Sequence, residues 1–157
     1  MSVRVRQAVA RDAAACCEVL RRSIRELCAA DYAEVPGFVD TWLENKTPEQ
    51  VKRWIESPYT YCAVSLREDA TVGFGAISNQ AEVLLCYVVP EVKGAGVGYQ
   101  LLSHLEAWGR DEGHRRFSTV STVTARAFYE RQGYRLAGEP VYVGETVVEY
   151  PMVKAFR

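Results

Sequence analysis

The sequence predicts a single α/β domain over residues 1–157, with one mixed, mostly antiparallel twisted sheet of about seven strands flanked by helices. Three observations lead to this fold class. Short segments alternate apolar and polar side chains, as half-buried strands do. Longer segments carry apolar residues at helical spacing, and strands are expected on both sides of a central, strongly amphipathic one. The chain has no repeat, low-complexity segment or linker, so its 157 residues fit one core.

The N-terminal part of the chain predicts one strand followed by two helices. Residues 3–8 alternate apolar and polar side chains and are expected to form the first strand. Residues 11–30 carry apolar side chains at helical spacing, and Asp12 is expected to cap that helix at its start. A short second helix is expected within residues 31–46, where an aromatic-rich group follows a Pro-Gly turn.

The next helix has the clearest start signal of the chain. Thr47 is a good N-cap residue, and Pro48 occupies the first helical position, where a missing N–H costs nothing. Gln50 stands where a capping box requires a side-chain acceptor. Because the residue before a proline avoids helical backbone angles, we expect the helix to end at Ser57.

The middle and C-terminal parts predict further strands around one long amphipathic helix. The expected strands cover residues 59–66, 71–79, 82–89, 115–121, 134–137 and 146–154. The apolar face of the long helix consists of Val97, Leu101, Leu102, Leu105 and Trp108. Gly113 is expected to end this helix, and a shorter helix is expected over residues 124–132. The last strand, residues 146–154, is expected at a sheet edge, where it could pair across a homodimer.

Composition and charge exclude several classes of protein. Hydrophobic residues make up 48% and charged residues 25% of the chain, and the formal net charge is −1. Since basic residues are interspersed with acidic ones, we expect neither nucleic acid nor a membrane surface as a partner. The longest apolar run, residues 83–89, is too short to span a bilayer, and the N-terminus has no signal-peptide pattern. A cytoplasmic location is therefore expected.

The five cysteines are expected to be reduced core thiols. They are Cys16, Cys17, Cys28, Cys62 and Cys86. Their number is odd, no pair has CxxC spacing, and the chain has only two histidines. Each cysteine also lies within an apolar pattern. The sequence therefore predicts neither a disulfide framework nor a metal site.

Residues 90–102 place three glycines at alternate positions between a strand and a helix. Glycine loses more backbone freedom on folding than any other residue, so this loop must require bare backbone. A strand, a glycine loop and a helix N-terminus together can bind phosphate through free N–H groups. The spacing is wrong for a Walker A loop and for a dinucleotide-binding loop.

The pattern Lys93-x-x-Gly96-x-Gly98, preceded by "YVVP", resembles the acetyl-CoA signature of the Gcn5-related N-acetyltransferase family. That signature begins with Arg or Gln, so Lys93 is a conservative departure. The resemblance implies that successive backbone amides cradle the pyrophosphate of acetyl-CoA. These amides would belong to Gly94, Ala95, Gly96, Val97, Gly98 and Tyr99.

Residues 122–136 resemble a second motif of the same family, Asn-x-x-Ala-x-x-Phe-Tyr-x-x-x-Gly-Phe. The matching residues are Ala125, Phe128, Tyr129, Gly133 and Tyr134. Thr122 replaces the asparagine that contacts the pantetheine arm in the family, and its hydroxyl could partly replace that contact. The resemblance makes Tyr129 the general acid that protonates the departing thiolate.

The same resemblance implies roles on the strand before the glycine loop. Backbone amides around Cys86, Tyr87 and Val88 would meet the thioester oxygen, where a bulge separates this strand from its neighbour. Glu82 matches a carboxylate that some relatives use as the general base. A solvated charge at the end of a strand explains Glu82 equally well.

The acceptor site is expected within residues 24–60, and two interpretations of this segment stay open. Its aromatic residues (Tyr32, Phe38, Trp42 and Trp54) and its acids (Asp31, Glu34, Asp40 and Glu44) could line a pocket for a cationic amine. Alternatively, the aromatic residues pack the short helices onto the sheet while the acids face water.

The predicted function is acetyl-CoA-dependent transfer of acetyl to the amine of a small molecule or a protein. Two alternatives remain. The domain could be a non-catalytic acyl-CoA sensor, or it could transfer another acyl group or acylate a hydroxyl.

Overall fold

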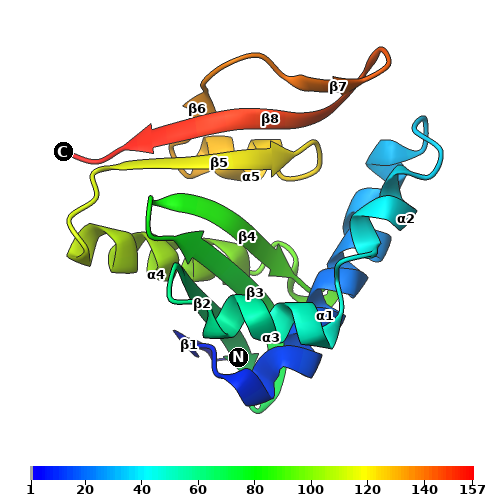
Figure 1. The fold of residues 1–157 in the computed structure, drawn as a ribbon. Coiled ribbons are helices and arrows are strands. Elements are labelled where there is room, and N and C mark those ends of the chain that lie inside the picture. Colours follow the sequence, from blue (N-terminus) through cyan, green and yellow to red (C-terminus); the bar gives the residue numbers. More distant parts are fainter. Residues whose placement is uncertain (1) are drawn as a thin grey trace.

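The computed structural model describes residues 2–157 and contains one eight-stranded sheet (Figure 1). The strands are β1 (Val3–Gln7), β2 (Thr60–Arg67), β3 (Ala70–Ser78), β4 (Glu82–Val88), β5 (Arg116–Thr122), β6 (Arg135–Leu136), β7 (Val141–Val143) and β8 (Thr146–Ala155). Their order is β1-β2-β3-β4-β5-β8-β6, and β7 also pairs with β8. Among the strand pairs within residues 2–157, only β4–β5 is parallel. The predicted mixed, mostly antiparallel sheet is therefore confirmed, with β7 as a strand that the sequence did not predict.

Helices cover both faces of the sheet. The α-helices are α1 (Ala13–Ser23), α2 (Phe38–Leu43), α3 (Pro48–Glu56), α4 (Val97–Asp111) and α5 (Arg126–Arg131). Shorter helical turns are η1 (Ala10–Asp12), the π-helical η2 (Ile24–Cys28), η3 (Ala29–Tyr32) and η4 (Pro90–Val92). Within residues 2–157, no helix is both long and apolar enough to cross a membrane.

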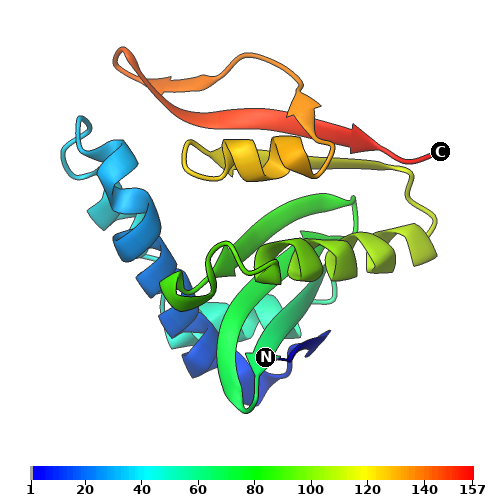
Figure 2. The ribbon, with the colours of Figure 1, turned by 180° about the vertical axis from the view of Figure 1, so that it is seen from behind.

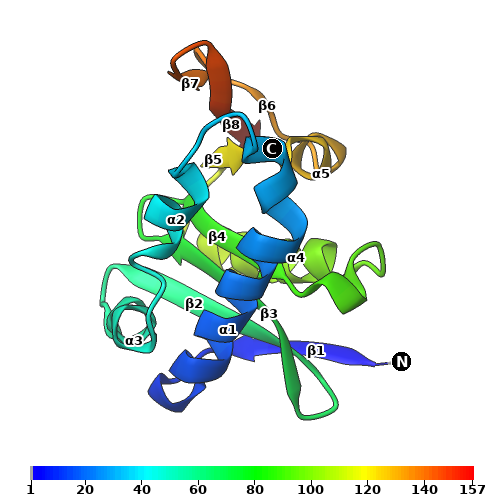
Figure 3. The ribbon, with the colours of Figure 1, turned by 90° about the vertical axis from the view of Figure 1, so that its right-hand side faces the viewer.

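The two faces of the sheet have separate apolar clusters. On one face, Leu20 of α1 and Val51 of α3 are fully buried with Phe74 of β3. On the other, Leu101 and Leu105 of α4 are fully buried in a cluster that also includes residues of α5 (Figure 2). Figure 3 shows α1 and α2 beside the end of the sheet at which β4 and β5 diverge.

The start of α1 differs from the prediction in its bonding. Asp12 occupies the N-cap position, but its side chain makes no capping bond to α1. Its carboxylate instead accepts from Val9 N–H at 2.8 Å and pairs with Arg6 at 2.8 Å. The helical turn η1 precedes α1 and directs the carboxylate of Asp12 toward residues that come before the helix. The hydrogen bond with Arg6 lowers the pKa of Asp12.

The cap of α3 is confirmed in its main feature. Thr47 Oγ1 accepts from Gln50 N–H at 3.1 Å, and Pro48 is the first helical residue. The Gln50 side chain does not complete a capping box, because its Oε1 accepts from Arg53.

The expected edge position of residues 146–154 is wrong. The strand β8 pairs with β5 on one side and with β6 and β7 on the other, so it lies inside the sheet. The short β6 and the β7–β8 hairpin cover the backbone that a partner copy would need. The argument for a homodimer through this strand is thereby lost.

Replacing Gly109 by valine is expected to destabilise the fold by about 2 kcal/mol. A Cβ at Gly109 would lie 2.5 Å from Cε2 of Phe117, a ring that is fully buried in β5. Neither the helix nor the ring can move without opening the core. Thermal or urea unfolding measures the loss. Ala107→Val lies at an exposed position of the same helix. It should lower the free energy of unfolding only by the difference between the helix propensities of alanine and valine. Equal losses in the two variants would contradict this packing role.

Candidate active site

The strands β4 and β5 are paired only at their N-terminal ends, through Glu82 and Val83. Beyond this point they diverge (Figure 1). The register between β3 and β4 shifts here, because Ala76 faces Leu85 while Ile77 faces Val83, so Leu84 is an extra residue. A β-bulge bends its strand and increases local twist. The bulge at Leu84 thus accounts for the split.

Backbone groups of β4 are left without a strand partner in the gap. Val89 N–H donates to Val72 C=O at 3.0 Å. Along an antiparallel strand, every second residue hydrogen-bonds its neighbour, and the residues between direct their backbone N–H groups the other way. Cys86 and Val88 therefore direct their N–H groups toward the gap, where β5 has parted. Both residues belong to the segment in which the sequence predicted an oxyanion-binding amide.

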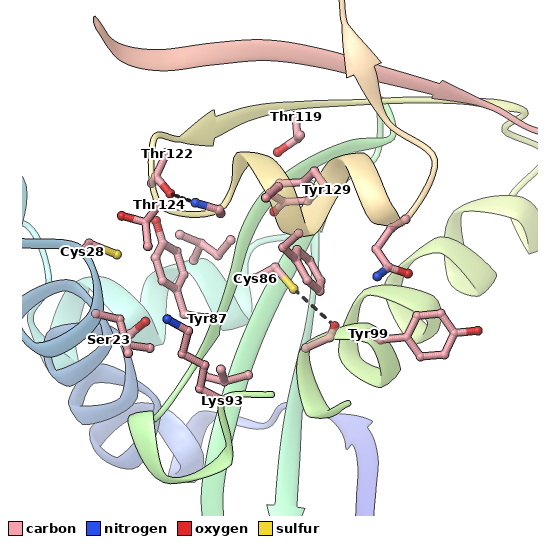
Figure 4. Close-up of a pocket in the computed structure, with 18 of the residues that line it drawn as sticks. Ser23, Cys28, Cys86, Tyr87, Lys93, Tyr99, Thr119, Thr122, Thr124 and Tyr129 are labelled. Carbon is pink, nitrogen blue, oxygen red and sulfur yellow. Dashed lines mark hydrogen bonds between the residues drawn. The ribbon is translucent and has the colours of Figure 1, made fainter. Parts of the chain in front are cut away.

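A cavity of about 570 Å³ lies between β4, the loop before α4, α5 and the end of α1 (Figure 4). Most of the predicted cofactor-binding residues line it, namely Cys86, Tyr87, Val88, Lys93, Gly94, Gly96, Gly98, Tyr99, Thr122, Ala125, Phe128 and Tyr129. Ala95 and Val97 are not among the lining residues, and the side chain of Val97 is buried in the core instead. These two could contribute only backbone groups.

The glycine loop provides free N–H groups at the start of α4. The first bond that closes the helix runs from Gln100 N–H to Gly96 C=O at 3.0 Å. The N–H groups of Val97, Gly98 and Tyr99 therefore precede the helical ladder. Gly94 and Gly96 have φ of +81° and +82°, and a Cβ on either would meet no atom within 4 Å. Bare, left-handed backbone thus borders open space, which suits a phosphate.

Side chains around the loop support this geometry. Gly98 packs on α5, since a Cβ there would lie 3.2 Å from Cε1 of Phe128. The side chain of Lys93 extends from the loop toward Tyr87, whereas the ring of Tyr99 points away from the cavity and is exposed (Figure 4). Arg22 of α1 forms an ion pair with Glu91 just before the loop. The loop is therefore held against α1, and its Lys93 lines the cavity together with Arg131 of α5.

Tyr129 is the buried acid candidate among the residues that line this cavity. Only 5% of the residue is exposed, and its ring packs edge-to-face against those of Phe128 and Tyr134. Burial raises its pKa well above the usual value and outweighs the opposing hydrogen bond with Thr119. The phenol therefore holds its proton at any ordinary pH.

The segment that carries the second motif is tied to η3. Thr122 Oγ1 accepts from Ala125 N–H at 3.0 Å, so this hydroxyl shapes the turn into α5. The Tyr32 hydroxyl accepts from Val123 N–H at 3.0 Å and donates to Val148 C=O at 2.8 Å. Thr124 donates to the Asp31 carboxylate at 2.7 Å. One predicted acceptor-site acid, Asp31, thus has a structural partner.

The model of the acetyltransferase (GNAT) domain family matches residues 27–156. The chain belongs to this acetyltransferase family. Its enzyme class and fold, predicted from two short motifs, are thereby confirmed. A comparison with curated protein sequences found no significant match.

Solved structures show the same GNAT fold. A GCN5-related N-acetyltransferase from Rhodopseudomonas palustris has 21% identity over 99% of this chain and 97% of its own, with a TM-score of 0.87. The PaiA N-acetyltransferase from Thermoplasma acidophilum, solved with coenzyme A, has 20% identity over 99% and 100%, with a TM-score of 0.80. An aminoglycoside 6'-acetyltransferase type Ii has 17% identity over 97% and 96%, with a TM-score of 0.73. These identities support a shared fold alone.

A second cavity of this GNAT domain, about 430 Å³, lies on the other side of the split. Leu84, Leu85, Tyr87, Val120 and Thr122 line both cavities. Three of these residues come from β4 and two from β5. The two cavities therefore meet along the gap between these strands.

Aromatic rings form one wall of the second cavity. Tyr32 stacks on Phe38 with ring centroids 4.8 Å apart, and Trp42 lies edge-on to Tyr32 and to Tyr87. These rings pack against one another and also line the cavity. Each of the two interpretations of residues 24–60 is therefore partly correct. Trp54 packs in the core beside α1 instead. The acids Glu34, Asp40 and Glu44 do not line the cavity.

Two charged residues of the site had no clear signal in the sequence. The charged residues that line the second cavity are Lys46 and Glu149, and each is unremarkable in its own sequence context. Glu82, the predicted base, stands at the closed end of the split and lines neither cavity.

All five cysteines are free thiols, and residues 2–157 contain no cluster suited to a metal ion.

Proposed function

We propose that this acetyltransferase binds acetyl-CoA in the larger cavity and acetylates an amine that enters from the second cavity. The observation that carries the proposal is the shared wall of the two cavities along the split between β4 and β5. A bound acetyl-CoA would supply an acetyl group activated as a thioester. Everything else in the reaction can be assigned to residues of this chain.

The glycine loop would hold the pyrophosphate. Free N–H groups at the start of α4, together with the helix dipole, favour a group with negative charge. Open space at Gly94 and Gly96 lets such a group approach the backbone. Lys93 adds a positive charge from the same loop. These residues fit the cofactor that the fold implies.

The unpaired N–H groups of Cys86 and Val88 would stabilise the negative charge that develops on the thioester oxygen. Backbone donors held by the β3–β4 pairing need no rearrangement during the reaction. Tyr129, which lines the same cavity, would then donate its proton to the departing sulfur.

Glu149 fits the role of the base better than Glu82. Glu149 lines the second cavity and faces Thr122 across the β5–β8 pair, whereas Glu82 would have to act through water. We expect Glu149→Gln to lower turnover about 10²-fold, as loss of a general base does. The loss should be greatest at low pH, where the amine is mostly charged and most needs a base.

The matched comparison is Glu82→Gln, which should change the pH–rate profile little. A flat pH response in Glu149→Gln, or a larger effect in Glu82→Gln, would return the base role to Glu82.

Release of the coenzyme A thiol from acetyl-CoA, measured with and without a panel of amines, tests the proposed function. Thiol release that depends on an amine supports acetyl transfer. Tight binding without release across the panel would indicate an acyl-CoA sensor. Longer acyl-CoAs and alcohols in the same assay test the two remaining alternatives.

A further inference from the structure

Lys46 is a buried cation in the wall of the second cavity. Only 7% of the residue is exposed, and it follows α2 in the chain. Its Nζ donates to Asn45 Oδ1 at 2.7 Å and lies 5.8 Å from the centroid of the Trp54 ring. None of the ion pairs that the structure describes in residues 2–157 includes Lys46.

This environment is unusual for a lysine. Buried charges are normally paired, because removing an ion from water is costly. An ammonium group has three N–H donors, and the described contacts of Lys46 use one of them on a neutral amide. The cost of burial also lowers its pKa. An anionic group that entered the cavity would give this ammonium group the charge partner that it lacks.

Glu149 is the other charged residue in the wall of this cavity, and it comes from a different part of the fold. It belongs to β8 and pairs with Thr122 of β5, a residue that lines both cavities. Lys46 lines the second cavity alone. The negative side chain therefore lies beside the shared wall, and the positive one lies on a wall that the larger cavity does not share.

This arrangement gives a ligand a direction. An amine drawn to Glu149 would lie beside the shared wall, close to the acetyl group of the proposed function. An anionic group on the same molecule would reach Lys46. The rings of Tyr32, Phe38 and Trp42 line the same cavity and offer apolar contact.

We propose that the acceptor is a zwitterion, an amino acid or a similar small molecule, whose amine faces Glu149 and whose carboxylate binds Lys46. The proposal rests on the proposed acetyl transfer and narrows its substrate class. Diamines, which carry no anion, would leave Lys46 unpaired and should be poor acceptors.

The test compares matched acceptors in the thiol-release assay. The panel contains aromatic and aliphatic amino acids with α-, β- and γ-placed amines, the amide of each, and putrescine as a diamine. For the best amino acid, kcat/KM should exceed that of its amide by about tenfold to a hundredfold, the range expected for one charge-assisted contact. Equal use of acid and amide, or preference for putrescine, would overturn the proposal.

Lys46→Met removes the ammonium group and keeps most of the length of the side chain. It should lower kcat/KM for the amino acid by about tenfold or more, chiefly through KM, and change that of the amide little. Lys52→Met, at an exposed position of α3, is the matched control and should change neither. Lys46→Arg should keep the preference for the acid. Equal losses on acid and amide in Lys46→Met would make Lys46 structural and overturn the proposal.

Failure of the proposed function would look different. Calorimetry with coenzyme A measures the larger cavity independently of any acceptor. If coenzyme A binds but no amine releases thiol, acetyl transfer itself fails and the zwitterion proposal falls with it. If amines with and without a carboxylate are acetylated equally well, only the zwitterion proposal fails.

Discussion

Replacing Gly96 by valine is expected to weaken coenzyme A binding by about a hundredfold or more, because the change strains the residue and reshapes the loop. Gly96 has a φ of +82° and forms the N-cap of α4. A β-branched residue cannot adopt this left-handed conformation without strain. Relief of that strain would move the N–H groups of Val97, Gly98 and Tyr99, which are the proposed phosphate contacts.

The effect should fall on binding more than on stability. A Cβ at Gly96 would meet no protein atom within 4 Å, so the valine side chain would project into open space at the cavity. A bound pyrophosphate would compete for that space. Isothermal titration calorimetry with coenzyme A measures the affinity, and thermal unfolding measures the stability of the free protein.

Gly37→Val is the matched control for this prediction. Gly37 is also a helix N-cap, with a φ of +80°, and a Cβ there would likewise meet no atom within 4 Å. It precedes α2, however, and does not line the larger cavity. The two variants should lose similar stability, and only Gly96→Val should lose affinity for coenzyme A. Unchanged affinity in Gly96→Val would remove the glycine loop from the cofactor site.

The parts of the site that could be predicted from the sequence are those built from contiguous segments. Gly96 and Gly98 meet a local backbone requirement, and Tyr129 lies in a short helix with its own recognisable spacing. A requirement that involves only neighbouring residues leaves its pattern in the chain. Most of the residues that were predicted to bind the cofactor therefore line the larger cavity.

The second cavity could not be predicted in the same way. Lys46 and Glu149 are far apart in the sequence, and each has the ordinary context of a surface charge. Only the fold, through α2 and β8, brings both to one cavity. The strand β7 was missed for a similar reason, since its three exposed residues are defined as a strand by pairing with β8 rather than by any alternation of burial.

The prediction for Tyr129 concerns the rate of the reaction and not the affinity for its cofactor. Tyr129→Phe is expected to lower kcat about 10²-fold, the usual cost of losing a general acid, while coenzyme A binds as before. The ring would stay, so its edge-to-face contacts with Phe128 and Tyr134 would be kept. Steady-state kinetics and calorimetry on the same preparation separate the two quantities.

The pH dependence gives this role a further test. Burial raises the pKa of Tyr129 well above its usual value, so the phenol remains protonated as the pH rises. Ionisation of this phenol should therefore cause no decline of the wild-type rate at alkaline pH. The alkaline part of the pH–rate profile should have the same shape in the wild type and in Tyr129→Phe. Such a decline, absent from the variant, would mean that the phenol ionises in the working range and has more contact with water than its burial allows.

Tyr134→Phe provides the contrast that decides between catalysis and packing. The hydroxyl of Tyr134 donates to the buried Glu106 carboxylate at 2.7 Å, and Lys154 contacts the same carboxylate at 3.2 Å. Its loss leaves one fewer donor for a buried charge and should cost about 1–3 kcal/mol of stability, with turnover nearly unchanged. Tyr129→Phe should show the opposite pattern. If both variants lose stability and neither loses turnover, the phenol of Tyr129 is a packing group and another donor must protonate the departing thiolate.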